Sequence, residues 1–177
     1  MYGLVGNTKA LEFAGTNDSV KQFFTLPNMS SLTQGEMMIW MKRNTGSSYN
    51  RIHRIGTASD GYYPYSGLGV YDAFGTTSRK DGIFSASIPP TNIWHSYDVY
   101  SASSNWGMRL NDGGIGNYST GSNTVGFNSS PRLGADYDGS SYASSFLGHM
   151  AEVVITSSVL SSAQRTAVYD YFLEEYT

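Results

Sequence analysis

Paired carboxylates are the first chemistry to consider, because two of them on one strand can hydrolyse a glycosidic bond. A retaining glycosidase holds its two carboxyl groups about 5–5.5 Å apart, and alternate residues of a strand point into the same cleft. None of the chain's glutamates is followed by carboxylates two and five residues later; they are Glu12, Glu36, Glu152, Glu174 and Glu175. The sequence therefore argues against a glycosidase of this kind.

Nucleophilic catalysis has no better support in the sequence. The chain has no cysteine, and it contains neither a G-x-S-x-G elbow nor an H-E-x-x-H helix. Its three histidines, His53, His95 and His149, are scattered over separate predicted strands. A histidine held there by packing or hydrogen bonds is the simpler interpretation. We predict that the protein is not an enzyme.

Tyrosine-rich loops indicate a different function, the binding of carbohydrate. The apolar faces of a sugar stack on flat rings, while its hydroxyls bind amide and carboxylate groups. The candidate carbohydrate-binding residues are Asp60, Tyr62, Tyr63, Tyr65, Asn105, Trp106, Tyr137 and Tyr142. The alternative is that each ring packs at the edge of the fold or at a subunit contact. For the loop tyrosines both interpretations stay open, whereas Trp40 and Trp94 lie within predicted strands and are expected in the core.

Asp136 and Asp138 are the best candidates for a metal site. Calcium takes about six to eight oxygen ligands at loop geometry, and these two carboxylates stand in a Gly/Ser-rich loop. Asp60 and Asp72 are further candidates. The alternative is that these aspartates form turns by bonding their own backbone. For this loop we therefore expect either bound Ca2+ or aspartates that only stabilise turns.

The composition narrows the class of protein. The net charge of −3 provides no basic field for nucleic acid, and charged residues are 14% of the chain against about 25% in an average domain. No apolar run reaches the roughly 18 residues of a membrane helix, and the first residues lack the basic and apolar parts of a signal peptide. We expect neither nucleic-acid binding, nor membrane insertion, nor secretion through a signal peptide.

Many short strands separated by Gly, Asn and Ser turns must position these side chains. Predicted strands span residues 10–15, 20–24, 36–42, 51–57, 67–74, 82–87, 94–100, 106–110, 125–128, 131–134 and 150–156. Residues 59–66 and 135–142 are predicted loops, and residues 111–114 a tight turn. Met29, Met37, Met38 and Met41 are expected to fill the core. The pattern predicts an all-β fold, an antiparallel β-sandwich with one short C-terminal α-helix.

The end of the chain predicts that helix. Ser161 and Gln164 have the spacing of a capping box, in which each side chain bonds the other's backbone amide. After them, Ala167, Val168, Tyr171 and Phe172 fall on one helical stripe. We expect a closing strand followed by a short helix laid against the fold through these four residues.

This closing segment, GHMAEVVITSSVLSSAQRTAVYDYFLEEY, resembles the end of laminin-G-like (concanavalin A-like) jelly-roll domains, where a G-x-I-A-E-V strand runs into LS-x-x-E-R and a helix. Other segments are similar to family motifs in the same order along residues 10–176: ALEFAG, MIWMK, WHSYD and RLNDG. The resemblance implies a jelly roll that commonly binds glycans or proteins through its rim loops, and often one calcium ion. It does not fix a ligand.

Two functions are consistent with this resemblance. The first is a non-enzymatic virion surface module, a capsid decoration or tail-fibre type protein of a bacteriophage, made in the host cytoplasm. Its partners would be capsid or tail proteins, with cell-surface glycans as further ligands, and it would form a homo-oligomer. The alternative is a stand-alone lectin, calcium-dependent or calcium-independent. In both, residues 1–9 are predicted to form an N-terminal arm and residues 10–177 a single jelly-roll domain.

Overall fold

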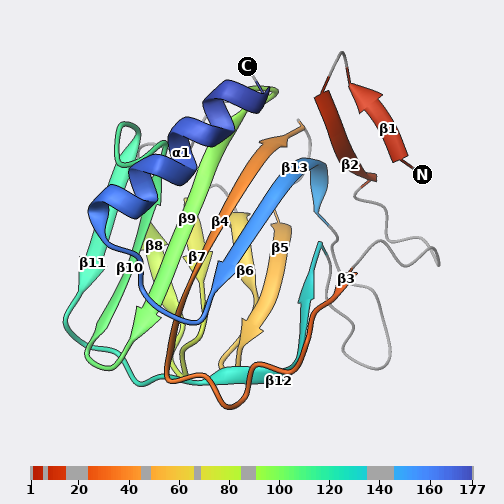
Figure 1. Cartoon of the computed structure of the whole chain (residues 1–177). Helices are drawn as coiled ribbons and strands as arrows, with labels where there is room; N and C mark the ends of the chain where they lie inside the picture. The colour runs from red at the N-terminus through yellow and green to blue at the C-terminus, as the bar shows by residue number, and fades with distance from the viewer. Residues whose placement is uncertain are drawn as a thin grey trace.

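Two antiparallel β-sheets pack face to face in the computed structural model, and one helix covers the outside of the first sheet (Figure 1). The structure describes residues 2–5, 8–14, 24–44, 49–65, 69–84, 91–134 and 146–176. This arrangement confirms the predicted all-β sandwich with a C-terminal helix. None of the helices in these ranges is long and apolar enough to cross a membrane.

The first sheet has seven strands in the order β1-β2-β13-β4-β9-β10-β11. Their bounds are β1 Tyr2–Val5, β2 Thr8–Ala14, β13 Leu147–Thr156, β4 Gln34–Arg43, β9 His95–Ala102, β10 Asn105–Leu110 and β11 Gly116–Thr120. The closing strand β13 lies between β2 and β4, so the two ends of the chain meet in one sheet. Residues of the predicted N-terminal arm form β1 and the start of β2, and β1 pairs with β2 at the sheet edge.

The second sheet has six strands in the order β3-β12-β5-β6-β7-β8. Their bounds are β3 Phe24–Thr25, β12 Phe127–Leu133, β5 Tyr49–Gly56, β6 Gly61–Tyr65, β7 Val70–Asp72 and β8 Lys80–Ile83. Strand β6 corrects the prediction of a loop at residues 59–66, because its backbone pairs with β5 and β7 despite its Gly and Pro. Strand β12 joins the two short strands predicted at residues 125–128 and 131–134. The predicted strands at 20–24 and 82–87 lie partly outside the described residues.

The core lies between the two sheets and is built from alternate residues of the central strands. Met37, Ile39 and Met41 of β4 point into it, and they meet Tyr97 of the neighbouring β9. Met29 is buried in the same cluster. The prediction that these methionines are core residues is therefore confirmed, and the other side of β4 is left to face outward.

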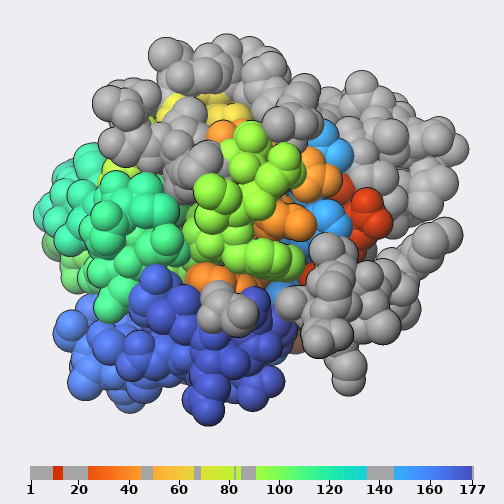
Figure 2. Space-filling view, turned by 90° about the horizontal axis from the view of Figure 1, so that it is seen from above, coloured from red at the N-terminus to blue at the C-terminus, as the bar shows by residue number. Residues whose placement is uncertain are grey.

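Helix α1, Ser162–Tyr176, covers that outward side of the first sheet, and Figure 2 shows it as a layer along one side of the molecule. The capping box forms as predicted: the Ser161 amide donates to Gln164 Oε1 at 2.9 Å, and the Gln164 amide donates to Ser161 Oγ at 3.3 Å. Phe172 is fully buried against Trp40. Tyr171 is instead 44% exposed and Ala167 is also exposed, so the predicted places of these two residues on the packed stripe are wrong.

A second hydrophobic cluster fills the space beneath the helix. Buried Met38 and Trp40 meet Phe172 there, with Val168 and Trp94 packed around them. The Trp94 ring stacks on Trp40 with centroids 6.5 Å apart. Residues 37–41 thus form a continuous apolar run because one side of β4 faces the sandwich core and the other faces α1.

Candidate functional site

The outer side of the second sheet gathers tyrosine and arginine side chains. We call this surface the tyrosine–arginine face; its residues are Arg51, Arg54, Asp60, Tyr62, Tyr65, Tyr71, Arg79 and Arg132. Strand register aligns several of them, because Arg51 lies opposite Tyr62 and Tyr62 lies opposite Tyr71. Side chains of directly opposed residues stand on the same side of a sheet. Helix α1 covers the other sheet and not this one.

Three tyrosine rings of this face pack against one another. Tyr65 stacks on Tyr71 with centroids 4.5 Å apart and planes 17° apart. The edge of Tyr62 contacts both rings at centroid distances of 5.4 and 5.6 Å. The Arg79 guanidinium lies 3.6 Å from the Tyr71 centroid and covers it. Buried Tyr71 therefore supports the partly exposed rings of Tyr62 and Tyr65.

Asp60 is the carboxylate that holds this face together. Its oxygens lie 3.3 Å from Arg51 Nε and 3.9 Å from Arg54 Nε. Arg51 Nε also donates to the Tyr62 hydroxyl at 2.7 Å, and the Arg51 guanidinium lies 5.1 Å from the Tyr62 ring centroid. These contacts fix a ring, a carboxylate and a guanidinium next to one another, and such groups can contact a sugar ring and its hydroxyls.

Other predicted site residues lie elsewhere. Tyr63 is fully buried against Tyr97, because strand alternation turns it inward where Tyr62 turns outward, and burial raises the pKa of its hydroxyl. Trp106 is also fully buried, and its Nε1 donates to the Phe74 carbonyl across the core at 3.1 Å. Neither ring presents a face to a ligand in this structure. Asn105 is exposed on the first sheet, apart from this face. Tyr137, Tyr142, Asp136 and Asp138 lie outside the described residues.

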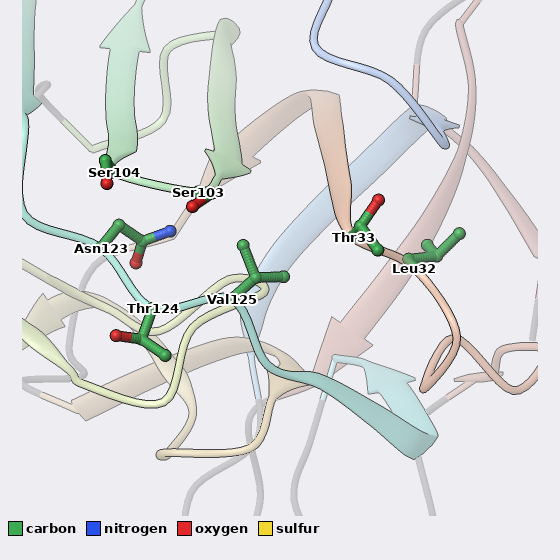
Figure 3. A pocket seen from close by; sticks show the side chains of 7 residues that line it. All are labelled: Leu32, Thr33, Ser103, Ser104, Asn123, Thr124 and Val125. Atoms are coloured by element: carbon green, nitrogen blue, oxygen red, sulfur yellow. The ribbon is translucent and has the colours of Figure 1, made fainter.

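A pocket at one end of the sandwich was not anticipated from the sequence. Its volume is about 510 Å³, and it is lined by Leu32, Thr33, Ser103, Ser104, Asn123, Thr124 and Val125. The residues come from three separate loops, with hydroxyl and amide groups around the hollow (Figure 3). Asn123 is fixed there, because its Nδ2 donates to Ser101 Oγ at 2.9 Å and to the Ala102 carbonyl at 2.8 Å. The lining is uncharged and suits hydroxyl-bearing ligands.

The histidines are buried, as the sequence analysis predicted. His53 Nε2 lies 2.8 Å from Asp72 Oδ2, and the Tyr97 hydroxyl and the Phe74 amide also donate to Asp72. His95 Nδ1 lies 2.9 Å from the Ile93 carbonyl, and burial lowers its pKa to about 4. Asp72 thus serves a structural network inside the core. Within the described ranges, no three His, Cys, Asp or Glu side chains gather as a metal site.

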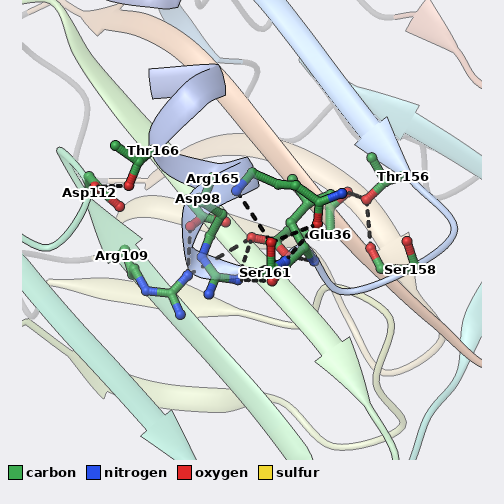
Figure 4. A network of polar contacts seen from close by, with 11 residues as sticks. Glu36, Asp98, Arg109, Asp112, Thr156, Ser158, Ser161, Arg165 and Thr166 are labelled. Carbon is green, nitrogen blue, oxygen red and sulfur yellow. Dashed lines mark hydrogen bonds and ion pairs between the residues drawn. The ribbon is translucent and has the colours of Figure 1, made fainter. Parts of the chain in front are cut away.

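A network of carboxylates and arginines lies between the first sheet and α1 (Figure 4). Glu36 accepts from the Leu160 amide at 2.6 Å and from Arg165 Nη1 at 3.3 Å. Asp98 accepts from Arg109 Nη1 at 3.0 Å. Burial is the main cause that holds the pKa of Asp98 well above its usual range, and the negative charge of neighbouring Glu36 raises it further. The network joins the helix to β4, β9 and β10.

Comparison with known proteins identifies structures that have a similar fold. No protein-family model matches the chain, and no curated protein matches it by sequence. Among solved structures, domain 4 of AbnA, a GH43 extracellular arabinanase from Geobacillus stearothermophilus in complex with arabinotriose, superposes with a TM-score of 0.66 at 17% identity. That match covers 96% of this chain and 79% of the other.

Two further structures are similar. The Ruminococcus gnavus IT-sialidase CBM40 bound to α2,3-sialyllactose has a TM-score of 0.61 at 14% identity, and the match covers 90% of this chain and 96% of that one. A carbohydrate-binding protein from Bacteroides ovatus has a TM-score of 0.67 at 15% identity, with 89% of this chain and 45% of that one covered. The chain therefore has the concanavalin A-like β-sandwich fold.

Proposed function

We propose that this protein is a carbohydrate-binding module without catalytic activity, and that the tyrosine–arginine face is its sugar-contacting surface. The observation that carries the proposal is the set of partly exposed Tyr62 and Tyr65 rings beside Asp60 and Arg51 on a sheet that the helix leaves uncovered. Proteins of the same fold that are described as carbohydrate-binding, or were solved with a bound saccharide, support it.

The face supplies both kinds of contact that a saccharide needs. The rings of Tyr62 and Tyr65 offer apolar surface to the C–H groups of a pyranose or furanose. Arg51 and Arg54 donate hydrogen bonds to sugar hydroxyls, and buried Asp60 holds both guanidinium groups in place. Tyr71 packs against both rings, so little of their side-chain freedom is lost on binding, which favours affinity.

A buried pair of carboxylates gives a reason to propose binding without hydrolysis. Glu36 and Asp98 are neighbouring carboxylates, and a glycosidase needs its two carboxylates in a cleft that is open to the substrate. Both side chains are 1% exposed or less beneath α1, and Arg165 and Arg109 bind them. A glycosidic bond cannot reach this pair without removal of the helix.

We further propose a more specific role, in which the protein is attached to a virion. The order of motifs resembles that of laminin-G-like domains, a kind of domain also found in phage structural proteins, and this analogy supports a role as a capsid decoration or tail-fibre module. In that role the protein would act as a homo-oligomer bound to capsid or tail proteins and would hold glycans weakly and many at a time. Light scattering tests this part, and a monomer at micromolar concentration would count against it.

A glycan array tests the proposed function, with Tyr62→Ala and Tyr65→Ala as site variants and Tyr171→Ala as a matched control. Tyr171 is an exposed tyrosine on α1, over the opposite sheet. Loss of a stacking ring together with its buried area should weaken binding about 10-fold, while the control binds as the parent does. A repeat with chelator tests the calcium expectation for Asp136 and Asp138. A blank array would refute the proposal.

A further inference from the structure

The pocket at the end of the sandwich shares no residue with the tyrosine–arginine face and has its own supply of hydroxyl groups. We call it the end pocket; it is lined by the seven residues labelled in Figure 3. Four exposed lining residues carry a hydroxyl group that makes no hydrogen bond to another described residue; they are Thr33, Ser103, Ser104 and Thr124. These hydroxyls therefore keep their full capacity to donate and to accept.

Hydrogen bonds behind the lining hold the walls of the end pocket in place. The Ser104 amide donates to the Asn123 carbonyl at 3.0 Å, and two hydrogen bonds fix the Asn123 side chain. The Thr124 carbonyl accepts from the Thr77 amide at 3.0 Å, which ties this wall to the segment between β7 and β8. A ligand therefore enters a preformed hollow, and little ordering free energy is lost on binding.

The backbone of Ser104 gives an independent reason to expect a function here. Its φ angle is +53°, in the left-handed region, where a glycine meets no steric cost and a serine does. Ser104 belongs to the two-residue turn between β9 and β10, and its hydroxyl forms no hydrogen bond within the described chain. The turn itself does not need this side chain, but the end pocket is lined by it. A strained residue that the fold does not require points to a role in binding.

The lining identifies the class of ligand. Among the described lining residues there is neither a charged side chain nor an aromatic ring, so an ionic ligand finds no counter-charge and a sugar ring finds no stacking partner. Hydroxyl and amide groups suit a neutral ligand that donates and accepts hydrogen bonds, while Leu32 and Val125 offer apolar contact to its C–H groups. The volume of about 510 Å³ lies within the range of small-ligand sites, about 300–1,000 Å³.

We propose that the end pocket is a second saccharide site, which binds one or two units of a neutral sugar through Thr33, Ser104 and Thr124. Binding there relies on hydrogen bonds and not on ring stacking. The inference goes beyond the proposed function, because neither site needs the other. It also gives a place to the predicted sugar ligand Asn105, the exposed neighbour of Ser104 along the chain.

Heteronuclear NMR titration of the isotope-labelled chain tests the inference. Lactose, maltose, cellobiose and xylobiose are the probes, and the signals of the Ser104 amide and of the Asn123 side-chain amide report on the end pocket. At least one probe should shift both signals saturably. Thr33→Val and Ser104→Gly should each weaken that binding about 2- to 10-fold, as expected for the loss of one hydrogen bond. Because glycine suits the turn, Ser104→Gly should leave Tm unchanged or raise it, which separates lost binding from lost folding.

Ser119→Ala is the matched control, because it removes one exposed serine hydroxyl from β11, outside the end pocket. It should bind the probe as the parent does. The inference fails if none of the four sugars shifts the two signals, or if glycerol shifts them as strongly at the same concentration.

Tyr62→Ala distinguishes this inference from the proposed function. Unchanged shifts of the end-pocket signals in Tyr62→Ala support a separate site, even if the tyrosine–arginine face binds no glycan on the array. If Tyr62→Ala abolishes the shifts, the sugar is bound at the face, so the inference fails and the proposed function stands.

Discussion

Replacing Phe172 by alanine tests whether α1 is an integral layer of the fold. The Phe172 side chain is 0% exposed, although it belongs to a helix on the outside of a sheet, and its ring lies 5.9 Å from that of Trp40. A buried Phe→Ala change costs about 3–5 kcal/mol of unfolding free energy through lost transfer energy and the cavity that remains. In a chain of this length, each kcal/mol lowers Tm by about 2–4 °C. The expected fall is therefore about 6–20 °C.

The neighbouring Tyr171→Ala is the matched control. Tyr171 is 44% exposed, and an exposed substitution usually changes stability by about 0.5 kcal/mol or less. Urea unfolding is followed by circular dichroism and by tryptophan fluorescence, because Trp40 and Trp94 lie beneath the helix and report its docking. A loss below about 1 kcal/mol for Phe172→Ala, or equal losses for the two variants, would refute the view that this ring anchors the helix.

Two further substitutions test particular contacts. The pKa of Asp98 is raised in the folded protein, so folding favours the protonated carboxyl group. Its contribution to the free energy of unfolding is complete below the unfolded pKa of about 3.8. That contribution is lost as the pH rises through the folded pKa. Asp98→Asn should therefore gain stability relative to the parent as pH rises, and parallel profiles in urea unfolding between pH 4 and 8 would contradict this. Gly56→Ala should destabilise by about 1–3 kcal/mol or more, because a Cβ there would overlap the backbone carbonyl of Ala73; an unchanged Tm would show that β5 and the segment after β7 can move apart at little cost.

Local signals account for the parts of the fold that could be predicted. Strand β4 was evident because both of its sides are buried, one by the core and one by α1, which leaves an uninterrupted apolar run. The start of α1 was evident because Ser161 and Gln164 need only each other to form the capping box. The turn after β10 was evident for the same reason: Asn111 and Asp112 adopt the positive φ angles that such residues tolerate.

The sequence-based predictions were wrong where residues distant in the sequence determine the local structure. Strand β6 contains Gly61 and Pro64, which favour a loop by themselves, but the neighbouring strands supply its hydrogen bonds on both sides. Once it is a strand, alternation buries Tyr63 and leaves Tyr62 outward, so a cluster that looked uniform in the sequence divides into a core residue and a surface residue. Strand β11 has no apolar alternation, because its residues 117–119 are exposed, and its pairing with β10 forms it.

The placement of the arginines in the candidate site depends most strongly on residues that are distant in the sequence. Arg54 and Arg132 are far apart in the sequence, and neither stands in a motif; antiparallel register alone places them opposite each other. The two outer surfaces of the sandwich then differ in a way that concerns function. On the first sheet, each carboxylate of the buried network, Glu36 and Asp98, is bound by an arginine, Arg165 or Arg109, and α1 covers the network. On the second sheet, comparable charges stand beside tyrosine rings without a helix over them. Because the helix of the described chain covers the first surface, the second surface is the one that we propose for a ligand.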